Sequence, residues 1–210
     1  MRDVREEYQA EELSKSDLHP DPLEQARIWV DQAIAAELPL ANGMTLATAD
    51  AQGRPSCRTV LLKGIEEGGF VFFTRYDSRK GDEISVNPNV AATLLWEPFS
   101  RQITLTGEVE RLSVAASREY FASRPRGSQL SAVVSPQSQP VSSRGWLEQR
   151  QQALAESIGD GDIPMPEQWG GLRIIPVEIQ FWHGRPNRLH DRFRYLRQAD
   201  GSWQLDRLAP

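Results

Sequence analysis

Residues 44–74 read MTLATADAQGRPSCRTVLLKGIEEGGFVFFT, and they establish the fold class more directly than any other part of the chain. Three runs in this stretch have the composition of β-strands: Met44–Ala49, Arg58–Leu62 and Gly69–Thr74. Asp50–Gly53, after the first run, and Glu66–Gly69, before the third, contain the glycine and acidic residues that are typical of hairpin turns. This stretch therefore predicts antiparallel strands that follow one another directly.

The rest of the chain continues this pattern and adds helices. Helices are predicted from Pro22, behind an Asp21 cap, to about Glu37, from Ser78 to about Asn87, and over Ser113–Ser123, Gly127–Ser135 and Ser143–Ile158. Further strands are predicted over Val90–Leu95, Ile103–Arg111, Leu172–Trp182, Arg188–Arg197 and Trp203–Leu208. Strands joined by tight turns, with helices between groups of them, favour a mainly β, α+β fold: an antiparallel barrel with peripheral helices.

The composition indicates one domain in a reducing compartment. The chain of 210 residues suits a single domain, predicted over residues 21–210, behind a polar and charged segment 1–20 that is expected to be mobile. A net charge of −5 and a pI of about 5.3 disfavour general nucleic-acid binding. The sequence contains no apolar run of membrane-spanning length, no signal-peptide pattern and one cysteine, Cys57, so the cytoplasm is the expected location.

The cations occur in short local groups, which suits small anionic ligands better than a polymer. In Arg188-Leu-His-Asp-Arg192, residues two apart share one face of the predicted strand, so Arg188, His190 and Arg192 would project together toward an anion. The alternative is a solvated surface strand. Arg58 and Lys63 flank an apolar strand, where they either meet anions or keep their charges at the rim of the core.

One candidate phosphate site lies at the start of the helix predicted after Thr74. Arg79 and Lys80 in its first turn oppose the helix dipole, and an anion bound there would explain their placement. The alternative is a solvated turn. Gln137 and Ser138 either donate to a phosphate or cap the helix that follows them.

A second candidate phosphate site combines Tyr120, Arg124 and Ser128. Tyr120 and Arg124 lie four residues apart, which predicts one helical face, and Ser128 would open the next helix. A Tyr/Arg surface stack with a serine cap is the alternative. Gln102, at the start of a strand, could read the polar edge of a heterocycle or make a strand-end hydrogen bond.

The sequence favours neither a metal site nor a nucleophilic enzyme. Its histidines, His19, His183 and His190, are far apart and lack ligand spacing. The chain contains no GxGxxG, P-loop or GxSxG motif, and spacing nominates no base for Cys57.

Taken in order, these segments resemble the pyridoxamine (pyridoxine) 5′-phosphate oxidase family. The matching segments are RTVLLK at 58–63, FFT at 72–74, SRK at 78–80, RQ at 101–102, YFxSRPRxS at 120–128, QS at 137–138, WGG at 169–171, FWxG at 181–184, RLHDRF at 188–193 and DRLAP at 206–210. The resemblance runs from about Arg5 to Pro210, and the order, the spacing and the ending all agree.

The resemblance implies a split β-barrel homodimer with FMN at the subunit interface. It implies oxidation of pyridoxamine or pyridoxine 5′-phosphate to pyridoxal 5′-phosphate, by hydride transfer from C4′ to the flavin N5, with O2 reduced to H2O2. Residues that match the flavin site are Arg58, Thr59, Val60, Leu61, Leu62, Lys63, Phe73, Thr74, Arg79, Lys80, Gln102, Gln137, Ser138, Trp182 and Arg192. Residues that match the substrate site are Lys63, Tyr120, Arg124, Ser128, Arg188 and His190, with Arg5 and Tyr8 in an N-terminal segment that can close over the substrate.

Arg188 and His190 match the pair beside the oxidised carbon and are the expected catalytic residues; either His190 or solvent would take the proton. The chain departs from the family pattern at Phe73, where tyrosine is common, and at Glu6, where a second basic residue can follow Arg5. Two rival interpretations are another split-barrel flavin oxidoreductase and a flavin or pyridoxal-phosphate carrier that binds without oxygen uptake.

Overall fold

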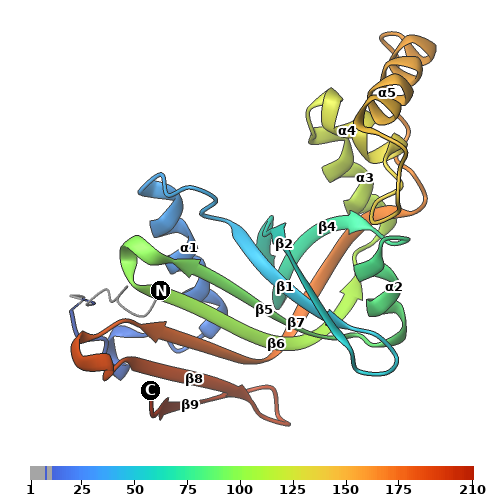
Figure 1. Cartoon of the computed structure of the whole chain (residues 1–210). Coiled ribbons are helices and arrows are strands. Elements are labelled where there is room, and N and C mark those ends of the chain that lie inside the picture. The colour runs from blue at the N-terminus through green and yellow to red at the C-terminus, as the bar shows by residue number, and fades with distance from the viewer. Residues whose placement is uncertain (1–7, 9–10) are drawn as a thin grey trace.

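A computed structural model of the chain describes Tyr8 and residues 11–210. In these residues, nine strands form one curled antiparallel sheet (Figure 1). Seven of them follow the order β2-β1-β5-β6-β7-β4-β3, and β8 and β9 extend the sheet beside β7. Their bounds are β1 Gly43–Ala49, β2 Pro55–Leu61, β3 Gly64–Glu66, β4 Gly69–Arg75, β5 Asn89–Trp96, β6 Arg101–Arg111, β7 Trp169–His183, β8 Asp191–Arg197 and β9 Trp203–Leu208. The predicted antiparallel barrel with peripheral helices is confirmed.

The β1–β2 hairpin forms as the sequence predicts. The Gly53 N–H donates to the Asp50 carbonyl oxygen at 2.9 Å, and Gly53 has a φ of 75°, a conformation that glycine adopts without strain. The short strand β3, which pairs with β4, was not predicted. Three residues are too few to show a strand period, so the sequence gives no signal for it.

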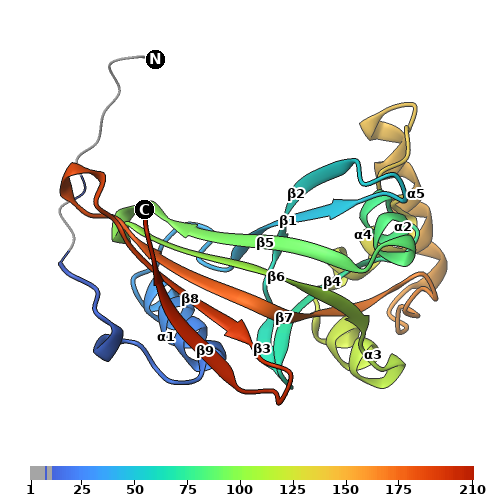
Figure 2. The ribbon, with the colours of Figure 1, turned by 90° about the horizontal axis from the view of Figure 1, so that it is seen from below.

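Strand β7 links the two ends of the molecule. Its first part, from Trp169 to Ile174, pairs with β4, and its last part, from Glu178 to His183, pairs with β8. Strand β6 pairs with β7 along both parts. In Figures 1 and 2, β7 runs from the end of the molecule that carries α3 and α5 to the end where β8 and β9 lie. The two ends of β7 therefore belong to different parts of the sheet.

Five α-helices in the described residues lie outside the sheet, close to their predicted bounds: α1 Pro22–Ala35, α2 Arg79–Val86, α3 Val114–Ser123, α4 Arg126–Val134 and α5 Arg144–Ile158. Helix α1 buries Ala26, Trp29 and Ala33, and the Trp29 ring meets Phe181 edge-on at 5.1 Å between centroids. Helices α3, α4 and α5 project beyond one end of the barrel (Figure 1). A smaller apolar cluster there includes Phe121 and Trp169.

The predicted strand Arg188–Arg197 is wrong at its beginning. Pro186–Arg188 form a 3-10 turn, in which Asn187 and Arg188 have φ values of 57° and 62°, and β8 begins only at Asp191. Proline removes a backbone donor, and two residues in the left-handed region turn the chain. Arg188 and His190 therefore do not share a strand face with Arg192.

The described part of the N-terminal segment packs against the body. Leu13 and Leu18 are buried, and the Leu13 N–H donates to the buried carboxylate of Asp191 at 3.0 Å. The Tyr195 hydroxyl donates to the His19 carbonyl oxygen at 2.7 Å. The expectation that residues 1–20 are mobile stays a prediction, and these contacts show what residues 11–20 must break to move.

Candidate active site

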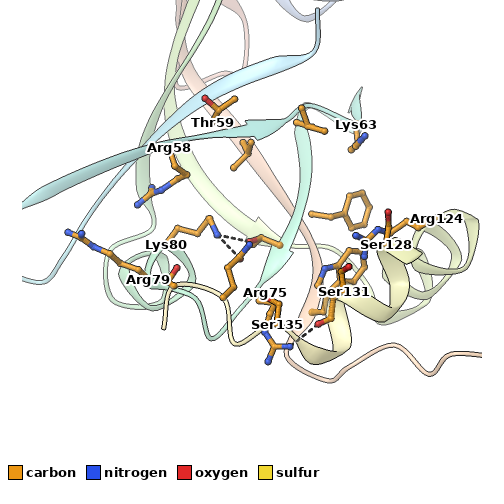
Figure 3. Close-up of a pocket in the computed structure, with 18 of the residues that line it drawn as sticks. Arg58, Thr59, Lys63, Arg75, Arg79, Lys80, Arg124, Ser128, Ser131 and Ser135 are labelled. Atoms are coloured by element: carbon orange, nitrogen blue, oxygen red, sulfur yellow. Dashed lines mark hydrogen bonds between the residues drawn. The ribbon is translucent and has the colours of Figure 1, made fainter. Parts of the chain in front are cut away.

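A cavity of about 790 Å³ lies between the barrel and the helices α2, α3 and α4 (Figure 3). It brings together predicted residues from four distant parts of the sequence: Arg58, Thr59, Val60, Leu61, Lys63, Phe73, Thr74, Arg79, Lys80, Tyr120, Arg124, Ser128, Gln137 and Ser138. Among the lining residues that the structure describes, none is Asp or Glu. The cavity wall is therefore cationic although the chain is acidic overall.

The cations at one end of the cavity are held by a buried carboxylate, Glu83 of α2. Glu83 Oε1 accepts from Arg79 Nε at 2.9 Å, and Glu83 Oε2 accepts from the Ser56 hydroxyl at 2.6 Å and lies 3.3 Å from Arg58 Nη2. Thr48 also donates to Oε2. Burial alone would raise the pKa of Glu83, but the hydrogen bonds from Ser56, Thr48 and Arg79 outweigh it and lower the pKa to about 2.

Lys80 lies beside this cluster, in the first turn of α2. Its Nζ donates to Thr74 Oγ1 at 2.9 Å, to Ser78 Oγ at 3.1 Å and to Gln137 Oε1 at 2.8 Å. Burial and the nearby charge of Arg58 lower the pKa of Lys80 to about 8. Ser78 caps α2 by accepting from the Gly81 N–H, and the N-terminal end of a helix attracts anions.

At the other end of the cavity, on the right in Figure 3, lie the cations Lys63 and Arg124 and the hydroxyl of Ser128. The hydroxyl-bearing Tyr120 also lines the cavity. The structure corrects the predicted common helical face, because α3 ends at Ser123 and Arg124 is its extended C-cap. Pro125 disfavours helical geometry at the residue before it. Ser128 lies in the first turn of α4, as expected, and Lys63 lies past the end of β2.

Phe73, one of the predicted flavin-site residues, contributes its ring to the cavity wall. It stacks on Tyr120 with a centroid distance of 3.7 Å and on Trp169 at 5.5 Å. These three rings form an aromatic wall on this side of the cavity.

The remaining predicted site residues lie elsewhere. Trp182 pairs in register with Gln102 on β6 and with Arg192 on β8, so these three form one row across the sheet. The rings of Tyr8 and His190 lie beside Trp182, at centroid distances of 5.4 and 4.7 Å. None of these residues lines the cavity, and neither does Arg188. Leu62 is a core residue, 4% exposed, and Arg5 lies outside the described residues.

His190 is held by the backbone. The Arg185 N–H donates to His190 Nδ1 at 3.1 Å, so the neutral ring carries its proton on Nε2. Burial, and then the positive charge of Arg188, lower the pKa of His190, while Asp191 partly opposes the shift. His190 is therefore neutral at physiological pH and presents an N–H donor.

Glu83 and Trp169 are among the residues of the site that were not predicted from the sequence. Glu83 follows Arg79 by four residues, a spacing typical of helical ion pairs, and this signal could have identified it. Trp169 lines the cavity and belongs to the WGG segment, which was noted without a role.

Two family models match the chain. One, described as pyridoxamine 5′-phosphate oxidase, matches residues 30–156, and another, described as pyridoxine 5′-phosphate oxidase C-terminal dimerisation region, matches residues 169–210. The chain belongs to the pyridoxamine 5′-phosphate oxidase family. A member from Alcanivorax borkumensis, named pyridoxine/pyridoxamine 5′-phosphate oxidase, is 61% identical over 210 residues, with both chains fully covered. One from Salinibacter ruber with the same name is 51% identical and covers 100% of this chain and 99% of its own.

Solved structures show the same architecture. PhzG from Burkholderia lata 383, in complex with tetrahydrophenazine-1-carboxylic acid, has a TM-score of 0.89 at 27% identity, covering 96% of this chain and 99% of its own. A pyridoxamine 5′-phosphate oxidase-related, FMN binding protein from Nostoc punctiforme has a TM-score of 0.75 at 20% identity, covering 92% of this chain and 100% of its own. At that identity the second likeness supports the fold alone.

The described residues contain neither a cluster of metal ligands nor a helix that could span a membrane. No three side chains among His, Cys, Asp and Glu come together there as a metal site would need. No helix in the described ranges is long and apolar enough to cross a bilayer.

Proposed function

We propose that this chain is an FMN-dependent oxidase that converts pyridoxine and pyridoxamine 5′-phosphates to pyridoxal 5′-phosphate. The observation that carries the proposal is one cavity with two separate groups of phosphate-binding side chains at its two ends (Figure 3). An enzyme that brings two phosphate esters together needs two such groups. Relatives that carry this activity in their names match the whole chain at 51–61% identity.

The residues present fit FMN at the Glu83 end. Arg58, Arg79 and Lys80 supply three cations, and the first turn of α2 supplies N–H donors, which together suit a phosphate dianion. Lys80 is buried and lacks a carboxylate partner among the described residues, a costly arrangement that an anion would relieve. Bound here, FMN would supply the redox chemistry, as hydride acceptor from the substrate and electron donor to O2, which would leave as H2O2.

The substrate phosphate is assigned to the other end. Lys63 and Arg124 supply charge, and Tyr120 and Ser128 supply hydroxyl donors. Placing the two phosphates at opposite ends keeps their charges apart while the rings between them come into contact. The protein contributes position and charge, and the hydride chemistry belongs to the cofactor.

A second copy of the chain would complete the site. Arg188, His190, Trp182 and Arg192 lie in the region that the second family model describes as a dimerisation region, and they do not line the cavity of their own chain. We therefore propose a homodimer in which these residues face the partner's cavity. The 40% exposure of Leu61, which lines the cavity, fits coverage by a partner.

Within this proposal His190 orients the substrate, and solvent takes the proton. Nδ1 accepts from the Arg185 N–H, and Nε2 is the protonated nitrogen of the neutral ring, so neither nitrogen is a free base. Arg188 would stabilise negative charge that develops near the reacting carbon. The Tyr8 ring lies 5.4 Å from the rings of Trp182 and His190, which supports a role of the N-terminal segment as a lid over the substrate. The proposed location of the enzyme is the cytoplasm.

Spectroscopy and oxygen uptake test the proposal. The purified chain, incubated with FMN and desalted, is expected to stay yellow and to consume O2 when pyridoxine or pyridoxamine 5′-phosphate is added, releasing H2O2. Pyridoxine without its phosphate is the control and should react far less. A colourless protein would refute the flavin site, and a yellow protein inert to both esters would be a carrier.

A further inference from the structure

We propose that Trp169 is a positioning residue for the substrate-phosphate arginine, Arg124, and that it acts by holding the guanidinium on the face of its ring. The Arg124 Cζ lies 4.9 Å from the Trp169 ring centroid, within the range of a cation–π contact. This inference rests on the proposed function, because it assigns Arg124 to the substrate phosphate. It adds a residue to that site and explains how the site keeps its charge.

The Arg124 guanidinium contacts aromatic rings and no carboxylate among the described residues. No carboxylate among the described residues lies within salt-bridge distance of it, and its Nη1 is buried without a hydrogen-bond partner. Burial lowers the pKa of Arg124, and Tyr120 partly offsets this shift. A guanidinium still titrates far above neutral pH, so the charge remains and lacks a counter-ion until an anion enters.

At the opposite end of the cavity, arginines are held by a carboxylate instead of an aromatic ring. There Glu83 holds Arg79 and Arg58 and cancels one of their charges. A ring face orients a guanidinium by attraction to its π electrons and cancels none of its charge. Trp169 thus gives Arg124 a fixed position and leaves its full charge for the phosphate.

The backbone around Trp169 is fixed, which a positioning residue requires. Trp169 pairs in register with Arg75 at the start of β7, and its N–H donates to the Pro166 carbonyl oxygen at 3.0 Å. A Cβ on Gly170 would lie 2.1 Å from the Tyr76 hydroxyl, so glycine at the next position lets β7 pack this close to Tyr76. The Trp169 side chain is 5% exposed, and Phe121 meets it edge-on.

Trp169 also aligns the second phosphate donor. The Tyr120 ring is parallel to the Trp169 ring within 2°, at a centroid distance of 6.3 Å, and Phe73 stacks with both. Offset-stacked rings of this kind restrict one another's tilt. One side chain therefore supports both Arg124 and the Tyr120 hydroxyl.

Steady-state kinetics on the FMN-saturated enzyme test the proposal with Trp169→Leu and Trp169→Phe. Leucine keeps apolar volume and removes the π face, whereas phenylalanine keeps a weaker one. We expect KM for pyridoxine 5′-phosphate to rise about 5- to 30-fold in Trp169→Leu and less in Trp169→Phe, from the usual strength of a desolvated cation–π contact. The inhibition constant of inorganic phosphate should rise in parallel, while kcat and FMN affinity stay within about twofold.

Trp146→Leu is the matched control, because Trp146 carries Arg150 at 4.7 Å on α5, outside the cavity. Its KM should equal that of the wild type. Arg124→Ala removes the guanidinium itself, so Trp169→Leu should raise KM less in that background than it does alone, and only through its effect on Tyr120. An unchanged KM in Trp169→Leu would overturn the proposal, as would equal losses of substrate and FMN affinity, which indicate a general packing defect. A wild-type enzyme that fails to oxidise the ester refutes the proposed function instead, so the two failures are distinguishable.

Discussion

Glu83→Gln is expected to destabilise the fold strongly and in a pH-dependent way. The carboxylate is buried, with 6% of its side chain exposed, and it accepts hydrogen bonds from Ser56 and Arg79 while lying against Arg58. Glutamine keeps the shape and one acceptor oxygen but removes the charge, so two guanidiniums lose their counter-ion.

The magnitude follows from the pKa of Glu83, which falls from 4.5 to about 2 in the folded protein. At about 1.4 kcal/mol per unit, this shift corresponds to roughly 3 kcal/mol. Because Arg79 is 64% exposed and solvent screens that pair, we expect a loss of about 2–3 kcal/mol at pH 7. The folded-state pKa is lowered, so the carboxylate stabilises the fold above about pH 4.5 and loses this effect as the pH falls toward 2.

Urea unfolding of the FMN-free protein at fixed concentration, from pH 7 down to about 2.5, measures this effect. The free energies of unfolding of wild type and Glu83→Gln should differ most at neutral pH and converge in acid. Glu148→Gln is the control: it breaks an exposed pair with Arg144, also four residues apart on a helix, and should cost at most about 0.5 kcal/mol. Equal losses in the two variants, or a difference that does not depend on pH, would refute the reasoning.

Three further predictions concern the reaction and the cofactor. Arg188→Ala should lower kcat about 10- to 100-fold with FMN still bound, as loss of a charged hydrogen bond does; an unchanged kcat in stopped-flow or oxygen-uptake assays would remove Arg188 from the reaction. His190→Gln, which can place a donor near the position of Nε2, should keep kcat within about tenfold, whereas a loss of about 10³-fold would indicate that His190 is the base after all. At pH values above 8, Lys80 loses its proton, and the FMN dissociation constant, measured by fluorescence quenching, should increase by up to about tenfold per pH unit. Lys80→Met should abolish this pH dependence.

Residue pattern was enough to predict most of the local structure. The alternation in Met44–Ala49, the caps Asp21 and Ser78 and the break at Pro125 each act within a few residues, and the structure confirms the elements that they predict. The failures are local exceptions to periodicity: β3 is too short to show a period, and the turn at Pro186–Arg188 interrupts a strand-like run.

The sequence by itself also determined the positions of the charged and hydroxyl side chains along the chain. These positions were enough to predict the two phosphate sites around Arg79 and Arg124. The tertiary structure alone decided that both groups line one cavity, and that Arg188 and His190 lie away from it. It also decided how each cation is held, Arg79 by a carboxylate and Arg124 by a tryptophan ring 45 residues further along the chain. The physical reason is range: propensities and caps act between neighbours in sequence, whereas burial and electrostatic pairing act between neighbours in space.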